Sequence, residues 1–312
     1  MEKLEEVLNR LGEKMSKAVE EPVSRAAEVG QGRAPRLLPD RHPVRDFFIA
    51  DVLDWAVKDD RHSMEHPMFS LSKKPDKRIR RYEHNAISVT VTPSVLGLAT
   101  IWDKDILLYC ISVLVEGLNQ GRNDISRTVR LTAYDLLVTT NRTTGGRSYE
   151  ELKAALERLR GTSITTNIST NGTRQARGFG LIDNWEIVER SPANGRMVGV
   201  EITLNKWLYN AIVACEVLTL NREYFRLLGG LERRLYELAR KHCGNQAKWS
   251  ISMELLHKKS GSQATLVKFR EMVKRAVAGD ALPDYRLRYD PEGDQVMFYT
   301  KDAQRLAASL GG

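Results

Sequence analysis

Apolar positions recur at helical spacing in some stretches of the chain and alternate with polar positions in others. Apolar residues at every third or fourth position predict an amphipathic helix over residues 2–19 and a strongly apolar helix over residues 103–118. Between them, residues 21–43 contain four prolines and two glycines, a composition typical of a linker. Alternation of apolar and polar side chains predicts a half-buried strand over residues 87–92.

A helix, a short turn and a second helix are predicted in the middle of the chain. Thr132 is expected to cap the first helix, residues 133–140, because a threonine hydroxyl can accept a hydrogen bond from the first helical turn. Residues 141–146 form a polar turn that contains two glycines. Ser148 and Glu151 have the spacing of a capping box, so the second helix is expected to begin at Ser148.

Three strands are predicted after these two helices. Asn171 with Gly172 and Asn194 with Gly195 are dipeptides that favour two-residue hairpin turns, and residues 198–204 alternate in the manner of a strand. A helix-turn-helix followed by such a β-meander is the pattern of a winged helix, in which a β-hairpin called the wing lies beside the two helices. We expect the wing tip at the first of the two hairpins.

The same order of elements recurs in the last third of the chain. A long helix is predicted over residues 220–243, a short strand over 249–252 and a short helix over 252–259. After a turn, a second helix is predicted over residues 263–277, and two strands flank a turn at residues 290–293. The sequence therefore predicts an α+β fold with two winged helices in tandem.

This pattern divides the chain into three parts. Residues 1–85 are expected to form an N-terminal helix and a mostly irregular extension, residues 86–218 the first winged-helix domain and residues 219–312 the second. The helix at residues 2–19 is either an oligomerisation or partner-binding element or a frayed terminal helix.

Charge and cysteine content narrow the range of functions. The chain has 312 residues, a formal net charge of +8 and a pI near 9.3, which fits a polyanionic partner without establishing one. Its three cysteines form no CxxC pair and no disulfide framework. No apolar run is long enough to cross a membrane, and the charged N-terminus lacks the apolar core of a signal peptide, so we expect a cytoplasmic protein.

Two winged helices indicate DNA binding, because the second helix of a helix-turn-helix fits the major groove of B-DNA. Such binding requires cations on that helix, at its first turn and on the wing. Thr143 and Ser148 are expected to bind a phosphate, and Arg147 or Tyr149 to reach base edges. The first-unit candidates, which include the predicted wing tip at residues 171–178, are Arg142, Thr143, Thr144, Arg147, Ser148, Tyr149, Lys153, Arg174 and Arg177.

In the second unit the basic residues are denser. Gln263 is of the residue type that reads adenine. The alternative for any single cation is a solvated surface charge. We expect the second unit to supply most of the affinity and the first to divide its work between DNA and a protein partner. The second-unit candidates are Lys258, Lys259, Ser260, Ser262, Gln263, Thr265, Lys268, Arg270, Lys274, Arg286 and Arg288.

Motifs for catalysis are nearly absent from the sequence. The chain has no P-loop, no GxSxG motif and no His-hydrophobic-His pair of the kind found in nicking enzymes, so we expect neither an enzyme nor a bound cofactor. His62, Glu65 and His66 fit the HxxEH pattern of zinc peptidases if the segment is helical. Pro67 and the polar character of the segment favour a charged loop instead, which makes a zinc-dependent hydrolase a distant alternative.

Three stretches are distinctive in combination: residues 82–91 (YEHNAISVTV), 101–106 (IWDKDI) and 231–241 (LERRLYELARK). They resemble the replication initiator protein A family of proteobacterial plasmids, and the likeness covers roughly residues 45–300. The resemblance implies an initiator that binds repeated sites (iterons) in double-stranded DNA at a plasmid origin and helps to open the duplex. It also implies recruitment of the host initiator and the replicative helicase, and repression of the initiator's own promoter. In related initiators the first winged helix also forms dimers, and the monomer is the form that is active at the origin.

The main alternative is a transcriptional regulator, since the same two modules could occupy an operator. An initiator is expected to bind several direct repeats and to support replication of a plasmid that carries them. A regulator is expected to bind a palindrome near a promoter and to fail in that replication assay.

Overall fold

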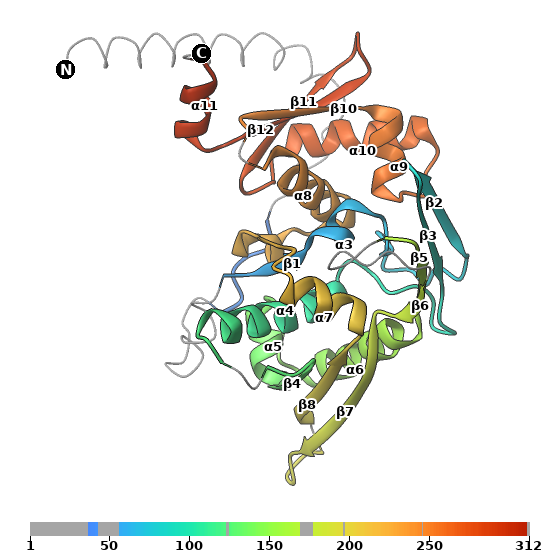
Figure 1. Ribbon diagram of the computed structural model, residues 1–312, viewed down its shortest axis with the longest axis vertical. Coiled ribbons are helices and arrows are strands. Elements are labelled where there is room, and N and C mark those ends of the chain that lie inside the picture. The colour runs from blue at the N-terminus through green and yellow to red at the C-terminus, as the bar shows by residue number, and fades with distance from the viewer. Residues whose placement is uncertain are drawn as a thin grey trace, which may run out of the picture. The chain divides into compact units, whose positions relative to one another are not determined.

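The computed structural model describes residues 37–42, 56–122, 125–168, 177–195, 197–244 and 246–310. All of these belong to one unit of the chain, residues 35–312 (Figure 1). The predicted helix at residues 2–19 and the predicted wing residue Arg174 lie outside the described residues.

The first winged helix consists of three helices and a three-stranded sheet. β4 pairs antiparallel with β8, and β8 pairs with β7, so the β7–β8 hairpin is the wing. Thr132 caps α5 as predicted, because its hydroxyl accepts a hydrogen bond from the Asp135 N–H (3.1 Å). The elements are α4 (Lys104–Asn119), β4 (Thr128–Thr132), α5 (Ala133–Thr139), α6 (Gly146–Gly161), β7 (Ile182–Arg190) and β8 (Met197–Leu204).

The second winged helix repeats this order. β10 pairs with β12, and β12 pairs with β11, which is the strand arrangement of the first unit. The shared topology confirms the predicted α+β fold with winged helices in tandem. The elements are α8 (Gly230–Cys243), β10 (Lys248–Ser252), α9 (Met253–Ser260), α10 (Leu266–Gly279), β11 (Tyr285–Asp290) and β12 (Gln295–Thr300), with α11 (Ala303–Leu310) after them.

Each winged helix buries its own apolar cluster. Leu136, Leu152 and Leu156 of α5 and α6 are at most 1% exposed in the first cluster. Phe269 of α10 and Phe298 of β12 are fully buried in the second cluster. Each such side chain contributes about 1.5–3 kcal/mol through burial, so the apolar periodicity of the sequence fixes the inner face of these helices. Among the described residues, no helix is long and apolar enough to cross a membrane.

The long helix predicted over residues 220–243 is interrupted. Residues Arg222–Arg226 form a 3₁₀ helix, η1, which is capped by the side chain of Asn221. The chain then runs extended until α8 begins at Gly230. A side chain at Gly230 would lie 2.4 Å from the carbonyl oxygen of Leu71, so a glycine is required where α8 packs against the preceding segment.

The strands predicted as one meander belong to two sheets. A separate sheet has the order β2-β3-β5-β6, formed by β2 (Arg80–His84), β3 (Ile87–Thr92), β5 (Ser163–Thr166) and β6 (Arg177–Gly180). The predicted wing at residues 171–178 is therefore wrong, and the wing turn instead contains Asn194 and Gly195. The reason is non-local: β3 offers β5 a partner strand, with Val91 opposite Ile164.

Part of the extension predicted as mostly irregular, residues 1–85, forms regular elements. β1 (Lys58–Asp60) pairs with β9 (Val217–Thr219), and α3 (Arg61–Glu65) follows β1 directly. Asp60 caps α3 by accepting hydrogen bonds from the N–H groups of His62 and Ser63. The pairing partner of β1 follows α7 (Lys206–Val213), far along the chain, which explains why no local pattern predicts this strand.

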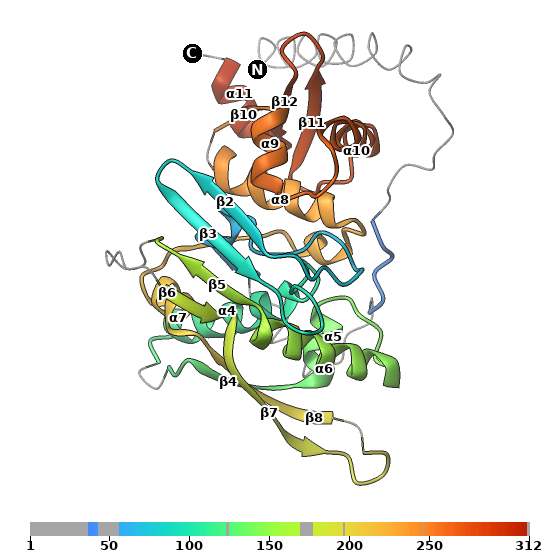
Figure 2. The ribbon, with the colours of Figure 1, turned by 90° about the vertical axis from the view of Figure 1, so that its right-hand side faces the viewer.

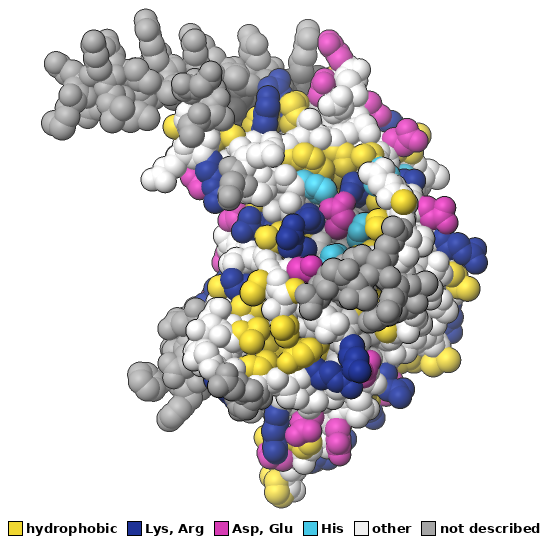
Figure 3. All heavy atoms as spheres, viewed as in Figure 1, with side chains coloured by type: hydrophobic (Ala, Val, Ile, Leu, Met, Phe, Trp, Pro, Cys, Tyr) yellow, Lys and Arg dark blue, Asp and Glu magenta, His cyan; other side chains and the backbone are white. Residues whose placement is uncertain are grey.

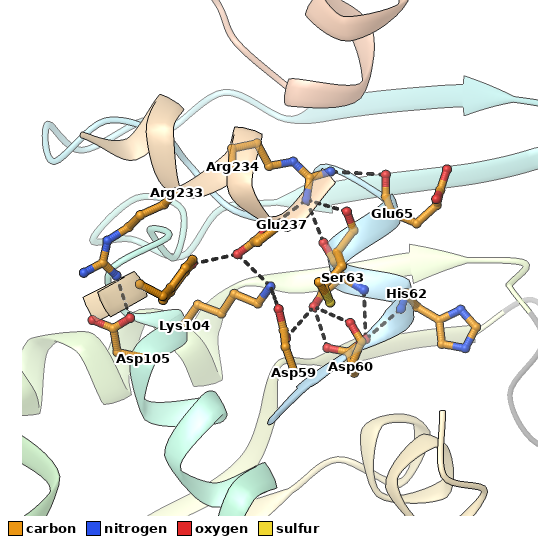
Figure 4. Close-up of polar contacts among 12 residues, drawn as sticks. Asp59, Asp60, His62, Ser63, Glu65, Lys104, Asp105, Arg233, Arg234 and Glu237 are labelled. Atoms are coloured by element: carbon orange, nitrogen blue, oxygen red, sulfur yellow. Dashed lines mark hydrogen bonds and ion pairs between the residues drawn. The ribbon is translucent and has the colours of Figure 1, made fainter. Parts of the chain in front are cut away.

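A buried network of charged side chains joins the two winged helices (Figure 4). Lys104, at the start of α4, donates hydrogen bonds to Asp59 of β1 (2.6 Å) and to Glu237 of α8 (2.9 Å). All three side chains are at most 1% exposed. The next residue of α4, Asp105, accepts a hydrogen bond from Arg233 of α8 (2.6 Å). A helix of the first unit is thus bonded directly to a helix of the second.

Arg234 of α8 attaches the segment around α3 to the second winged helix. Its guanidinium donates to Glu237 (3.0 Å) and to the carbonyl oxygens of Ser63 (2.9 Å) and Met64 (3.0 Å) (Figure 4). It also donates to the carbonyl oxygen of Lys259 in α9 (2.9 Å). One planar guanidinium therefore holds three segments together through several donors.

Lys104 and Glu237 of this network are charged at neutral pH, whereas burial raises the pKa of Asp59 to about 8. Burial opposes the charged form of Lys104, but the carboxylates of Asp59 and Glu237 outweigh burial and raise the pKa of Lys104. Burial likewise opposes the charged form of Glu237, yet Lys104 and Arg234 hold its pKa below the usual range. Removing one partner would therefore leave an uncompensated charge in the interior.

Replacing Lys104 with methionine keeps an unbranched side chain, one heavy atom shorter, and removes its charge. We expect the free energy of unfolding to fall by about 3–5 kcal/mol, because the buried carboxyl groups of Asp59 and Glu237 lose the ammonium that both contact. Urea denaturation followed by circular dichroism measures the change. Lys248→Met, at an exposed position of β10, should change stability by less than about 0.5 kcal/mol. Equal stability of K104M and the parent protein would contradict the role assigned to the network.

His66 makes the stability of the fold dependent on pH. It follows α3 with an extended backbone, and its buried ring lies against Tyr82, with 5.6 Å between ring centres. Burial lowers the pKa of His66 from 6.5 to about 4. The carboxylate of Glu65, although partly buried, has its pKa held well below the usual range by contacts with His242 and Lys259. Over most of the range from pH 6.5 to 4.5, His66 is therefore the residue of this pair that takes up a proton when the chain unfolds.

We expect stability to decline as the pH falls from 6.5 to 4.5. The unfolded chain takes up a proton at position 66 in this window, whereas folded His66 stays neutral until about pH 4. The pKa difference corresponds to about 2 kcal/mol at pH 4.5. His66→Gln cannot titrate and should have the flatter profile in thermal denaturation at pH 6.5, 5.5 and 4.5. Parallel profiles for the two proteins would show that His66 makes no such contribution.

Candidate nucleic-acid interface

The second helix of each helix-turn-helix lies on the same side of the unit. Figure 2 shows α6 and α10 toward its right-hand side, whereas α7 and β10 lie toward the left. In proteins with a helix-turn-helix, the second helix enters the major groove and is called the recognition helix. The side that carries α6 and α10 is therefore the candidate nucleic-acid interface.

The start of α10 is open to solvent and rich in groups that form hydrogen bonds. Thr265 caps the helix, since its hydroxyl accepts a hydrogen bond from the Lys268 N–H (3.4 Å). Gln263 and Thr265 are exposed, and Ser262 is half-buried. No acidic residue lies in the first turn of α10, so the positive end of its helix dipole is not neutralised there. Such a helix start suits contact with a phosphate.

α10 and the end of α9 carry cations that are available to a polyanion. Lys258, Lys268 and Arg275 are exposed and form no hydrogen bond or ion pair through their side chains within the described part of the chain. Lys274 pairs with an acidic neighbour on its own helix (3.1 Å), and its ammonium lies 5.4 Å from the ring centre of Tyr289. Exposed pairs of this kind hold a lysine only weakly.

An ion pair ties the second wing to α10. Arg270 donates to both carboxylate oxygens of Asp294 (2.9 and 2.8 Å), and the Tyr289 hydroxyl donates to the same carboxylate (2.8 Å). Arg270 therefore positions the wing turn beside the recognition helix. Arg286 and Arg288 of β11 are exposed, and Arg286 lies 3.4 Å from an aspartate at the end of α10.

Two residues predicted to contact DNA in the second unit face inward instead. Lys259 is buried, and its ammonium pairs with the carboxylate of Glu65, the last residue of α3. Ser260 is fully buried, and its hydroxyl bonds to the backbone on both sides (2.7 and 3.1 Å). The turn packs closely here, since a side chain at Gly261 would lie 2.6 Å from Pro67. Lys259 and Ser260 hold the turn and are not available to DNA.

Two residues at the start of α6 that were predicted to contact DNA are buried instead. Ser148 and Tyr149 are each 7% exposed, and Tyr149 belongs to the apolar core. The predicted capping box is wrong, because α6 begins at Gly146 after Gly145, and the Ser148 hydroxyl instead bonds to that of Thr143 (2.6 Å). The earlier helix start turns both Ser148 and Tyr149 toward the interior.

The arginines near this turn have partners within the protein. Arg147 is 92% exposed and pairs with Glu151 (2.9 Å). Arg142 donates to the carbonyl oxygen of Trp102 and lies 3.3 Å from Asp105, which also accepts a hydrogen bond from Arg233 of α8, so Arg142 lies beside the charged contact between the two winged helices. Of these two arginines, only Arg147 projects into solvent.

The remaining first-unit candidates are dispersed. Thr144 and Lys153 are half-buried. Arg177 begins β6, and Arg174 lies outside the described residues, so the wing of the first unit, β7–β8, contains neither of them. Their assignment to a wing followed from the hairpin signal at residues 171–172, which does not mark the wing.

The recognition helices differ in charge. The exposed side of α6 carries Glu150, Glu151 and Glu157, whereas Glu271 is the one acidic residue of α10. Arg158 of α6 is bound to Asp103 through two hydrogen bonds (2.7 Å each). The first unit thus presents a nearly balanced helix and the second a positive one.

Sequence reasoning missed a third group of cations, on the loop that enters β2. This loop contributes to a groove of about 550 Å³ that is also lined by Arg147 and Ser148 of α6. The run of basic residues is visible in the sequence, but no local pattern shows which side of the molecule it occupies. The exposed cations are Lys73, Lys74, Lys77 and Arg78 of this loop and Arg81 of β2.

The HxxEH motif, on which the distant alternative of a zinc-dependent hydrolase depends, does not assemble into a metal site among the described residues. Because α3 ends at Glu65, His62 and His66 do not share a face of one helix. Among the described residues, no group of three His, Cys, Asp or Glu side chains could hold a metal ion. Each side chain of the motif has a different partner: His62 contacts Glu216, Glu65 contacts Lys259, and His66 lies against Tyr82.

The other side of the unit has a mixed surface. Figure 3 shows the face on which α3, α7 and α8 lie, where apolar patches are interspersed with both basic and acidic side chains. Extended basic surfaces favour the phosphate backbone of a nucleic acid. This face therefore suits DNA less well than the side that carries α10.

The fold is similar to two solved structures of domains 2 and 3 of RctB. The first comparison has a TM-score of 0.55 at 10% sequence identity and covers 77% of this chain and 96% of that chain. The second has a TM-score of 0.50 at 11% identity and covers 77% and 97%. At such low identity the similarity concerns the fold alone.

Sequence comparison identifies the family. A protein of Wigglesworthia glossinidia brevipalpis, described as a candidate replication protein, is 42% identical over 257 residues, which are 82% of this chain and 93% of that relative. The model of the family described as "Replication initiator protein A" matches residues 58–287. The match begins at β1 and runs through both recognition helices to β11. As the sequence motifs predicted, the chain belongs to the replication initiator protein A family.

Proposed function

We propose that this chain initiates plasmid replication by binding double-stranded DNA at repeated sites of a replication origin. The observation that carries the proposal is the exposure of two recognition helices on one side of a single unit (Figure 2). Helices placed in this way can enter neighbouring major grooves on the same face of a duplex. Membership of a replication initiator family supports the same role.

The second winged helix, residues 219–312, supplies most of the affinity in this proposal. Its recognition helix offers available cations to the phosphates, and the wing adds the exposed Arg288. Gln263 and Thr265 stand at the helix start, where side chains commonly reach base edges. Glutamine recognises adenine through two hydrogen bonds, which makes Gln263 the proposed base-reading residue.

The first winged helix, residues 86–218, divides its work between DNA and protein. The glutamates of α6 disfavour a close approach to phosphates along most of the helix, so Arg147 at its N-terminal end is the proposed contact. Within the described part of the second unit, the β2-β3-β5-β6 sheet has no counterpart. This sheet is the proposed surface for the host initiator, the replicative helicase or a second copy of the chain.

A replication assay tests the proposed function. A plasmid whose only origin is the repeat-containing DNA beside the gene should be maintained when the intact protein is supplied, and deletion of the repeats should abolish maintenance. Binding to a palindrome near a promoter, without plasmid maintenance, would instead favour a transcriptional regulator. Repression of the protein's own promoter is compatible with the initiator, because the same recognition helices would occupy both sites.

Replacing Lys268 and Arg275 together with alanine tests the role of α10. Each phosphate contact releases about one counter-ion, so we expect the slope of log affinity against log salt concentration to become shallower by about two. Affinity should fall for specific and non-specific DNA. Fluorescence anisotropy at four salt concentrations measures both effects.

The matched control removes two cations from the other side of the unit. Lys206 of α7 and Lys248 of β10 are exposed, and neither element lies on the side of the recognition helices (Figure 2). The K206A/K248A variant should retain the salt slope of the parent protein. If K268A/R275A and the control behave alike, α10 does not lie on the phosphate backbone.

A further inference from the structure

The loop Ser72–Ile79, which we name the central loop, is a dense and exposed basic segment. Lys74 and Lys77 have no side-chain partner among the described residues, and Lys73 places its ammonium 5.0 Å from the ring centre of Trp102. Arg78 remains 66% exposed although it pairs with Asp76. Asp76, the acidic residue of the loop, is itself buried, so the exposed charge of the central loop is entirely positive.

Internal hydrogen bonds hold the central loop in place. The carboxylate of Asp76 accepts hydrogen bonds from Arg78 (2.9 Å) and from Arg80 (2.8 Å). The carbonyl oxygen of Asp76 accepts a further bond from the Leu98 N–H (2.8 Å). Gly97 allows this close packing, because a side chain there would lie 3.1 Å from the backbone nitrogen of Asp76. The lysines are thus displayed on an anchored loop, which lowers the entropy lost when they bind a partner.

The central loop lies beside both helix-turn-helix units. Arg80, the first residue of β2 and the next residue after the loop, lies 3.4 Å from the carbonyl oxygen of Gly261 in the turn between α9 and α10. Lys73 lines the same groove as Arg147 and Ser148 at the start of α6. In Figure 2 the chain that enters β2 passes between α8 and α6, on the side where both recognition helices lie. The loop therefore occupies the space between the two candidate DNA contacts.

We propose that the central loop binds the phosphate backbone of the DNA segment that lies between the two recognition helices. The proposal rests on the proposed function and adds a third contact to it. Two successive major grooves on one face of a duplex are separated by a minor groove with a phosphate backbone on each side. Cations placed between two helices in those grooves therefore meet phosphates, and they contribute affinity without reading sequence.

Replacing Lys74 and Lys77 with alanine tests the central loop directly. The expected result is a salt slope shallower by about two, with the same loss of affinity for specific and non-specific duplexes. In ethylation interference on a specific site, K74A/K77A should lose sensitivity at the phosphates in the middle of the site alone. The K268A/R275A variant should lose it at one end, and the K206A/K248A control should match the parent protein.

The outcomes separate this proposal from the function on which it rests. If K74A/K77A keeps the salt slope and the central interference while K268A/R275A loses affinity, the central loop does not touch DNA and the proposed function stands. If the parent protein binds no duplex, the proposed function is wrong, and the proposed role of the central loop is wrong with it. Equal thermal stability of K74A/K77A and the parent, expected for two exposed and unpaired lysines, excludes misfolding as the cause of any loss. A loss confined to binding of an acidic protein, with DNA binding intact, would also overturn the proposal.

Discussion

The ion pairs of Lys104 with Asp59 and Glu237 are the contact on which the arrangement of this protein depends. They connect β1, the start of α4 and the middle of α8, and they lie in the interior, where an unpaired charge would be costly. A buried charge satisfied by one set of partners allows few alternative packings of the two winged helices. The common orientation of α6 and α10 follows from this constraint rather than from any direct contact between those helices.

The segment of residues 59–65, which precedes β2, contacts both winged helices. It supplies Asp59 to the central pair, it offers backbone carbonyls to Arg234, and it pairs Glu65 with Lys259 in the second helix-turn-helix. The same segment then continues into the central loop. Residues with a structural role and residues with a proposed role in DNA binding are therefore adjacent in sequence. The buried charge of this segment helps to orient the two winged helices, and the exposed charges of the central loop lie between them.

Sequence patterns predicted the elements whose evidence is local. The helix-turn-helix pairs, the cap at Thr132 and the recurrence of one topology follow from helical periodicity, capping chemistry and turn residues. The patterns failed where the evidence is non-local. The wing was misplaced because β5 pairs with β3, which is distant in sequence. Tyr149 was predicted to lie on the surface because the helix start was placed two residues too late, which changes the direction in which its side chain faces. Lys259 was predicted to lie on the surface because its buried partner, Glu65, is distant in sequence. The basic run of the central loop was visible, but its position between two distant units was not.

In the proposed complex the two winged helices bind DNA as one body in a fixed orientation. The most direct test is to map the two protected segments of a specific site by hydroxyl-radical footprinting and then to insert about five base pairs, half a helical turn, between them. One segment should then move to the far face of the duplex, so that its protection is lost and affinity falls to that of a single unit. Unchanged affinity with both segments protected would show instead that the two winged helices move independently.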